Sequence, residues 1–195
     1  ADAYGGGVAV EPVYIEQIFS TYLYTGNGTA IGSGGKTISS LAFQPDFTWI
    51  KNRDATDSHM LFDAVRGATK YLESDTTDAE VTATESLASF TATGFTLGNN
   101  AAVNTNTEDY VAWNWKANGS GATNEDGAID STVSVNQGAG FSIVNYTGTG
   151  STTTVGHGLG VAPNFIIFKD REEGTGYNWA SYSSMLGATY NTGGL

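Results

Sequence analysis

Four aromatic residues have the types and spacing to form a stacking surface for a ligand. Tyr110, Trp113 and Trp115 stand in the stretch YVAWNWK, and Trp49 stands in FTWIK. Because side chains alternate along a β-strand, Trp113 and Trp115 face the same side of theirs. A flat ring with a polar edge fits the C–H face of a sugar, which makes these four residues the candidate ligand-binding set. The alternative is core packing, since one aromatic side chain buries about 150 to 250 Å².

The stretch KNRDATDSHMLFD is rich in carboxylates that could bind a hard cation. Asp54 and Asp57 are the candidates for calcium, which takes six to eight oxygen ligands. No EF-hand spacing supports a site, and a solvated loop with Asx turns explains the same residues. We therefore expect no metal and no other cofactor. The neighbouring DAVRG places Asp63 and Arg66 close in sequence, and we expect a structural role for them instead of ligand recognition.

Two basic pairs have the same spacing in two parts of the chain. Lys51 and Arg53 recur as Lys169 and Arg171. A ligand-binding role would vary between copies, so recurrence favours a role in the fold, such as pairing a carboxylate or capping strand carbonyls.

The residues that most hydrolases need do not form a recognisable set. His59 and His157 are the two imidazoles, and there is no Cys. The stretch VGHGLG around His157 lacks the Lys and the following helix of a phosphate-binding loop. Neither a G-x-S-x-G elbow nor an evident pair of catalytic carboxylates is present. We expect a protein that is not an enzyme.

The elements that position these residues belong to an internal repeat. Three stretches recur in the same order, with offsets of 122, 118 and 120 residues: FSTYLYTGNG (19–28) as FSIVNYTGTG (141–150), PDFTWIKNR (45–53) as PNFIIFKDR (163–171), and GAT (67–69) as GAT (187–189). Length drift of this size is typical of loops between fixed strands. We predict a tandem repeat.

Short runs with period two, parted by Gly, Asn, Asp and Thr, predict an all-β fold, an antiparallel sandwich or barrel. A strand is expected in 11–19, an edge strand because of Pro12, and hairpin turns at Gly26–Gly28 and Thr93-Gly94. Residues 73–87 are expected to form an acidic loop. The predicted organisation is an arm or linker (1–18), a first repeat (19–118), a polar Gly-rich linker with one strand, DSTVSV (119–140), and a partial second repeat (141–195).

The second copy is shorter than the first. After its GAT, the first copy continues for 47 residues to the end of YVAWNWK, whereas six residues remain in the second. Half of a sheet fold has unpaired strand edges. We therefore expect residues 141–195 to pair with strands outside this chain or in a continuation of it. The initial Ala, in place of Met, indicates processing or a longer chain.

Composition narrows the classes of partner. The chain has 195 residues and a net charge of −12, from 20 acidic and 8 basic residues. Nucleic-acid binding needs clustered Lys and Arg, which this balance does not supply. No apolar run approaches the 18 residues of a membrane span. We expect neither nucleic-acid binding nor membrane insertion.

Several blocks together carry a family resemblance. The blocks are FSTYLYTGNG, PDFTWIKNRDATDSHMLFDAVRGATKYL, GFTLG, YVAWNWKANGSG and TVGHGLGVAPNFIIFKDR. Over roughly residues 17 to 190 the chain resembles a repeated β domain of tailed-phage virion proteins, abundant in marine phages and associated with tail fibres. The resemblance implies a β-sandwich of the lectin or laminin-G kind, used in tandem for attachment or decoration. It carries no binding residues over to this chain.

These observations lead to one functional hypothesis and two alternatives. We expect a non-enzymatic virion protein of a tailed phage, part of a tail fibre or similar appendage for assembly and host attachment. Its expected partners are other copies of itself, in a homo-oligomer, other virion proteins, and glycans of the host surface. The alternatives are a free carbohydrate-binding lectin module, which would use the exposed tryptophans, and a capsid decoration protein.

Overall fold

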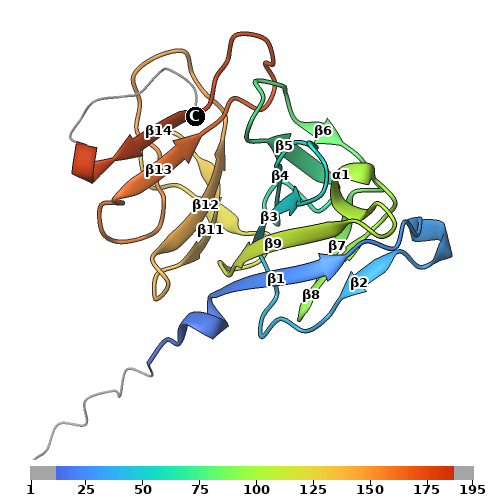
Figure 1. Cartoon of the computed structure of the whole chain (residues 1–195). Coiled ribbons are helices and arrows are strands. Elements are labelled where there is room, and N and C mark those ends of the chain that lie inside the picture. Colours follow the sequence, from blue (N-terminus) through green and yellow to red (C-terminus); the bar gives the residue numbers. More distant parts are fainter. Residues whose placement is uncertain (1–11, 187–195) are drawn as a thin grey trace, which may run out of the picture.

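The computed structural model describes residues 12–186 and consists almost entirely of antiparallel strands (Figure 1). The strands are β1 (Phe19–Thr25), β2 (Lys36–Ile38), β3 (Phe47–Asn52), β4 (Met60–Asp63), β5 (Lys70–Glu73), β6 (Val81–Thr82), β7 (Leu87–Thr91), β8 (Gly94–Leu97), β9 (Asp109–Trp115), β10 (Ala122–Asn124), β11 (Ser131–Asn136), β12 (Phe141–Tyr146), β13 (Phe165–Phe168) and β14 (Ala180–Ser183). The helical segments are α1 (Ala101–Asn104) and the 3₁₀ turns η1 (Ile15–Gln17), η2 (Ile31–Ser33) and η3 (Ser184–Leu186). None of the helices in this part of the chain has the length and apolarity to cross a bilayer.

Two sheets between Phe19 and Trp115 form a sandwich. One sheet has the strand order β1-β9-β3-β4-β5-β6, and the other has the order β2-β8-β7. Their inner faces share one core, to which Ile50 and Phe62 contribute from the first sheet and Phe95 and Leu97 from the second. These four side chains are completely buried. The predicted all-β sandwich is therefore confirmed.

Strand β9 holds the larger sheet together, because it pairs on one edge with β1 and on the other with β3. Tyr24 lies opposite Tyr110 in the first pairing, and Trp49 lies opposite Trp113 in the second. The strand joins segments that lie more than 50 residues before it in the chain. The alternation of YVAWNWK places Tyr110, Ala112 and Asn114 on the inner face.

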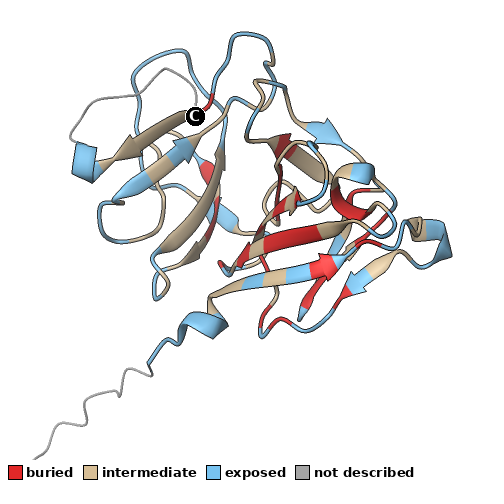
Figure 2. Ribbon diagram, viewed as in Figure 1, coloured by how far each residue is buried: buried red, intermediate tan, exposed pale blue. Residues whose placement is uncertain are grey.

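The second half of the described chain is less well buried. Its strands form the three-stranded sheet β10-β11-β12 and the two-stranded sheet β13-β14. Figure 2 shows buried residues concentrated in the sandwich, while the strands of the second half are mostly intermediate or exposed. Phe165 is 59% exposed and Val161 is 71% exposed, although Phe43, at the position matching Val161 in the repeat alignment, is 3% exposed.

Hydrogen bonds that match across the two halves support the predicted repeat. The Lys51 ammonium donates to the carbonyls of Asn52 (2.7 Å) and Ala55 (3.0 Å) after β3, and Lys169 donates to those of Asp170 (2.8 Å) and Glu173 (3.3 Å) after β13. At the other end of each strand, Ala64 N–H donates to Asp46 C=O, and Ser184 N–H donates to Asn164 C=O. The registers β3·β4 and β13·β14 also correspond, since Phe47 lies opposite Asp63 and Phe165 opposite Ser183. The tandem repeat remains a prediction, and these bonds are its structural support.

Two local predictions were wrong. No hairpin forms at Gly26–Gly28: β1 pairs with β9, and the chain then crosses to β2 in the other sheet. The Asn27 N–H is bound by the Asn104 side chain, which directs the turn toward α1 instead of a neighbouring strand. In 11–19, the described residues before Phe19 form η1 and not a strand, because Gln17 N–H donates to Tyr14 C=O and closes a turn.

Other expected elements are placed as follows. The hairpin at Thr93-Gly94 is present between β7 and β8. The acidic stretch 73–87 is mostly loop, but β6 and the start of β7 lie within it. The linker contains β11 as expected and also β10, which the sequence pattern did not predict. The second GAT (187–189) and most of the predicted arm (1–11) lie outside the described residues.

We predict that the Gly94→Ala substitution will destabilise the fold. Gly94 has φ +156°, and an added Cβ would overlap the carbonyl oxygen of Ile38 in the neighbouring strand β2. Overlap with backbone in a packed sandwich should cost about 2 to 4 kcal/mol of unfolding free energy, measurable by denaturant titration. The matched control is Gly32→Ala, whose Cβ would meet nothing within 4 Å. Equal stabilities of the two variants would contradict the prediction.

Candidate functional site

The three tryptophans of the candidate set lie together on the outer face of the six-stranded sheet. The Trp49 and Trp113 rings meet edge to face with centroids 6.2 Å apart, and Trp115 lies on the same face of β9. All three are half-buried. They are neither core residues of the sandwich nor an open platform.

The second half covers part of this aromatic face. The Trp115 ring contacts Phe19 and Phe47 from the same sheet, at 5.0 and 5.3 Å between centroids, and stacks at 6.2 Å on Phe141 from β12. A mostly apolar hollow of about 370 Å³ beside Trp115 is lined by Phe19, Phe141 and three aliphatic residues, Ile15, Ile18 and Ala139. Trp115 therefore contributes to the junction between the two halves.

A fourth tryptophan, which the sequence analysis did not single out, anchors the other end of this junction. Trp179 is 8% exposed and packs with Leu61 and Leu72, next to Trp49. Its indole N–H donates to the carbonyl of Glu73 at 2.9 Å. The repeat alignment could have pointed to Trp179. When the second GAT is matched to the first, Trp179 takes the position of His59, which contacts Trp49 in the first half.

His59 also supports the aromatic face. The Trp49 indole N–H donates to Nδ1 of His59 at 2.9 Å, and the two rings meet edge to face. Burial lowers the pKa of His59 more than the nearby Asp75 raises it, and Lys51 adds to the lowering. The imidazole therefore stays neutral and accepts the Trp49 hydrogen bond near neutral pH.

Tyr110, the remaining member of the candidate set, lies on the opposite face in the sandwich core. It is completely buried, and its ring stacks on Tyr24 at 5.1 Å. Its hydroxyl donates to the carbonyl of Ala101 at 2.7 Å and accepts from the N–H of Thr105 at 2.8 Å. Burial raises its pKa. Tyr110 therefore has no surface to offer a ligand.

The carboxylates of the two calcium candidates accept hydrogen bonds from other parts of the protein. Asp54 accepts a hydrogen bond from the N–H of Asp109 at 2.7 Å, and Asp57 accepts one from the side chain of Asn52 at the same distance. Within residues 12–186 there is no group of three or more His, Cys, Asp or Glu side chains that could hold a metal ion. The geometry gives these residues a role in loop structure.

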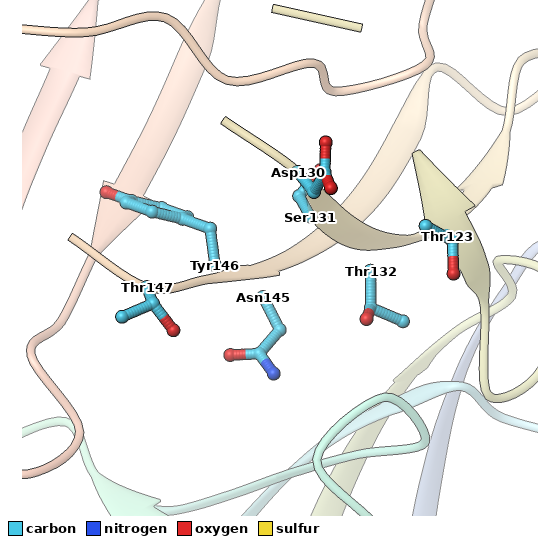
Figure 3. Close-up of a pocket in the computed structure, with 7 residues that line it drawn as sticks. All are labelled: Thr123, Asp130, Ser131, Thr132, Asn145, Tyr146 and Thr147. Atoms are coloured by element: carbon cyan, nitrogen blue, oxygen red, sulfur yellow. The ribbon is translucent and has the colours of Figure 1, made fainter. Parts of the chain in front are cut away.

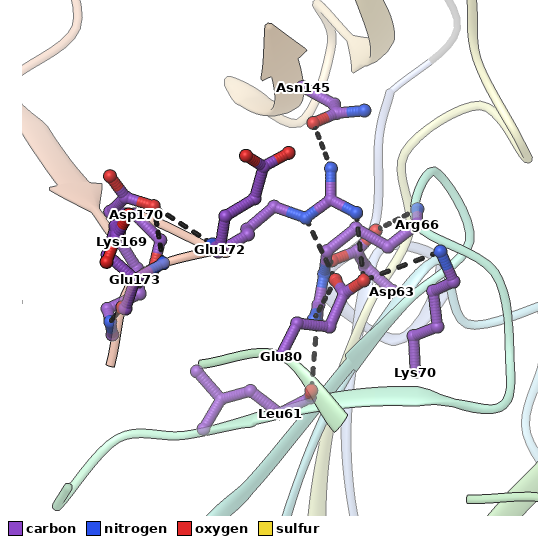
Figure 4. A network of polar contacts seen from close by, with 11 residues as sticks. Leu61, Asp63, Arg66, Lys70, Glu80, Asn145, Lys169, Asp170, Glu172 and Glu173 are labelled. Atoms are coloured by element: carbon purple, nitrogen blue, oxygen red, sulfur yellow. Dashed lines mark hydrogen bonds and ion pairs between the residues drawn. The ribbon is translucent and has the colours of Figure 1, made fainter. Parts of the chain in front are cut away.

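The densest cluster of charges centres on Glu80 and links the two halves (Figure 4). Arg171, from the second half, donates from Nε and Nη2 to the two oxygens of Glu80, each at 2.9 Å. Arg66 reaches Glu80 at 3.2 Å and Lys70 reaches it at 3.4 Å. Arg171 also donates to the Asn145 side chain, and the Glu80 N–H donates to the Arg171 carbonyl at 2.8 Å.

This cluster includes an ion pair between Asp63 and Arg66. Both side chains are almost completely buried, and Arg66 also donates to the carbonyl of Leu61 at 2.9 Å. Burial by itself would raise the pKa of Glu80. The hydrogen bond from Arg171 and the charges of Arg66 and Arg171 outweigh burial and hold that pKa below its ordinary value. The stability that Glu80 contributes is therefore present above its unfolded-state pKa, about 4.3, and is lost as the pH falls through its folded-state value.

A polar hollow lies on the second half, beside the sheet β10-β11-β12. It has a volume of about 240 Å³ and is lined by one aromatic residue, one carboxylate, one amide and four hydroxyl residues: Tyr146, Asp130, Asn145, Thr123, Ser131, Thr132 and Thr147. Figure 3 shows Asn145, Thr132, Thr123 and Thr147 pointing to the same side of the strands. Such a lining can form hydrogen bonds with the hydroxyl groups of a small polar ligand.

We predict that Glu80→Gln will loosen the junction between the halves. The amide keeps the shape of the side chain but cannot accept the bidentate, charge-assisted hydrogen bonds of Arg171. The Glu80 side chain is 11% exposed, and the amide can still form part of its hydrogen bonds, so we expect a loss of about 1 to 2 kcal/mol of unfolding free energy at pH 7. The difference from the wild type should shrink as the pH falls through the folded-state pKa of Glu80, which lies below its ordinary value. Chemical denaturation at several pH values measures both effects.

The matched control is Glu125→Gln, which removes the same charge at an exposed position. An effect of Glu80→Gln no larger than that of Glu125→Gln would contradict a structural role for the Glu80 cluster.

A known protein family covers both halves and the junction between them. The model of the family described as "Domain of unknown function (DUF7483)" matches residues 16–193. No curated protein and no solved structure matches the chain. Because the match spans most of the sequence, including the sandwich, the Glu80 cluster and the described part of the second half, this chain belongs to the DUF7483 family.

Proposed function

We propose that this protein is a non-enzymatic structural component of a tailed-phage virion, part of a tail fibre or a similar appendage, and that it works by assembly. The observation that carries the proposal is the incomplete covering of the second half. Strands β13 and β14 form a two-stranded sheet with Phe165 and Ile167 exposed by 59% and 39%. An isolated pair of strands is marginally stable in water, so such a sheet is expected to gain its stability from a partner.

The junction between the halves supports a mechanical role. The aromatic contact of Trp115 with Phe141, the buried Trp179 and the Glu80–Arg171 ion pair tie the second half to the sandwich at several separate points. A joint with apolar packing and directional ion pairs resists bending. Successive units joined in this way would form a stiff array, as an appendage that must reach a host surface requires.

The surface of the chain also suits this role. The net charge of −12 keeps a protein with 26 glycines soluble at the high local concentration of an assembled particle. The loops beside the hollow of Tyr146 and Asn145 carry polar residues such as Asp130 and Thr147. These loops are where contacts with host glycans would form.

Virion location can be tested directly. We expect tryptic peptides of the chain in gradient-purified particles of the phage that encodes it, at a copy number that is a multiple of the appendage symmetry. Gold-labelled antibodies against the recombinant chain should mark the tail in electron micrographs. Labelling of the head would instead identify a capsid decoration protein. Absence of the chain from purified particles would exclude both virion roles.

A second candidate function is carbohydrate binding, and the polar hollow favours it. Asp130 and Asn145 supply a carboxylate and an amide, and Tyr146, which is 43% exposed, supplies a ring. The volume of about 240 Å³ is sufficient for one sugar unit. The half-buried tryptophans Trp49, Trp113 and Trp115 remain the alternative sugar-contact residues.

Glycan-array binding with variants separates these two surfaces. If the hollow binds sugar, Asp130→Ala and Tyr146→Ala should each lower the affinity at least tenfold, because a site of this size depends on a few polar contacts and one ring. Tyr177→Ala, at another tyrosine that is 51% exposed, is the control and should bind as the wild type does. Loss of binding in Trp113→Ala alone would place the site on the aromatic face. No binding to any glycan would exclude the lectin function.

A further inference from the structure

One edge of β13 is unpaired in the part of the chain that the structure describes. The strand pairs with β14, and the Ser184 N–H to Asn164 C=O bond lies in the same ladder. Because backbone groups alternate between the two edges of a strand, those of Ile166 and Phe168 point toward β14, whereas those of Phe165 and Ile167 point away. The side chains of Phe165 and Ile167 are also exposed, by 59% and 39%.

The first half shows which strand occupies the corresponding edge. Strand β3 matches β13 in sequence, in its register with the next strand and in the hydrogen bonds of the loop that follows. On β3, the edge away from β4 is filled by β9, with Phe47 opposite Trp115 and Trp49 opposite Trp113. The edge of β13 that has no partner is therefore the edge that β9 fills on β3.

No described strand of the second half can serve both β12 and β13, as β9 serves β1 and β3. Strand β12 is paired with β11, which continues to β10. Strand β12 thus belongs to a separate three-stranded sheet, and within the described residues β13 pairs only with β14. An open edge with apolar side chains is a template for an added strand.

From this comparison we propose that the free edge of β13 is an acceptor site for an extended segment of another protein chain, which adds antiparallel to β13 as β9 adds to β3. The segment has the pattern of β9: large apolar residues at alternate positions, which lie opposite Phe165 and Ile167, with small or amide residues between them. This inference rests on the assembly role proposed above and names the chemistry of the partner.

The charge of the protein argues against the same edge of a second copy as the occupant. Two copies would each carry a net charge of −12 over the whole chain, and like charges disfavour their association. The contact itself would be limited to the four residues of β13 on each side. A β9-type strand is seven residues long and brings aromatic side chains that pack over the sheet.

A synthetic peptide with the sequence of residues 108–117 tests the acceptor site. We expect saturable binding of the labelled peptide to the full chain by fluorescence anisotropy, with one site per chain. On binding, the amides of Phe165 and Ile167 should gain protection from hydrogen exchange, whereas those of Ile166 and Phe168, which already face β14, should change little. A scrambled peptide of the same composition should bind at least tenfold more weakly.

Variants of the edge make the test specific. Ile167→Pro removes the outward N–H and should abolish binding, and Ile167→Lys, a milder change that leaves the backbone intact, should weaken it at least tenfold. Val161→Lys, at an exposed apolar residue outside strands β13 and β14, is the matched control and should bind like the wild type. A folded Ile167→Lys variant with undiminished binding, no saturable binding, or protection at β1 or β6 instead of β13 would each overturn the proposal.

Two outcomes separate this inference from its alternatives. Protection of Phe165 and Ile167 that depends on protein concentration without peptide would show that a second copy occupies the edge, and it would overturn the choice of partner. Failure of peptide binding, with the chain still found in purified virions, would refute the acceptor site and leave the proposed function intact. Peptide binding by a chain that virions lack would refute only the location.

Discussion

The architecture depends on one strand, β9, having a partner on each edge. Its pairing with β1 and β3 joins segments far apart in the chain and closes the six-stranded sheet over the core. Loop closure over such distances has an entropic cost that a local hairpin avoids. The buried side chains of β9, with Tyr110 between Tyr24 and the α1 backbone, offset this cost through apolar burial and satisfied hydrogen bonds. In the described part of the second half no strand is shared between β12 and β13, and Phe165 and Ile167 of β13 are exposed.

The two halves interact through side chains that are mostly half-buried, between the sandwich core and the solvent-exposed surface. Trp115 stacks on Phe141, Trp179 inserts beside Trp49, and Arg171 binds Glu80. The aromatic contacts bury apolar surface. The ion pairs fix the relative orientation of the two halves, because a bidentate guanidinium–carboxylate pair tolerates little rotation. This combination explains why the candidate tryptophans are half-buried. They contribute to the contact between the two halves, so a ligand on this face would have to share it with Phe141 and Trp179.

Local chemistry was predictable where the interacting residues are close in sequence or lie on one strand. The alternation of YVAWNWK predicted β9 and the common face of Trp113 and Trp115. The closeness of Asp63 and Arg66 in the sequence indicated a structural role, which they have as an ion pair. The partner of Glu80 was not predictable, because Arg171 lies 91 residues away. The Gly-rich turn after β1 was misread as a hairpin for a related reason: glycine permits a turn, but the Asn27–Asn104 contact, 77 residues apart, decides where the chain goes next.

The amino-acid pattern alone determined that the chain folds as antiparallel strands, where most of them lie, and that two segments share a β3-like strand and loop. These features follow from side-chain alternation and from local hydrogen bonds, such as those of Lys51 and Lys169 with the loops that follow them. Only the tertiary structure decided which face of β9 is buried, which strand fills each edge, and which charges meet at Glu80. The alternation of side chains shows that the two faces of a strand differ, but not which face packs against another part of the protein. Which strands pair edge to edge depends on all the strands that compete for each edge.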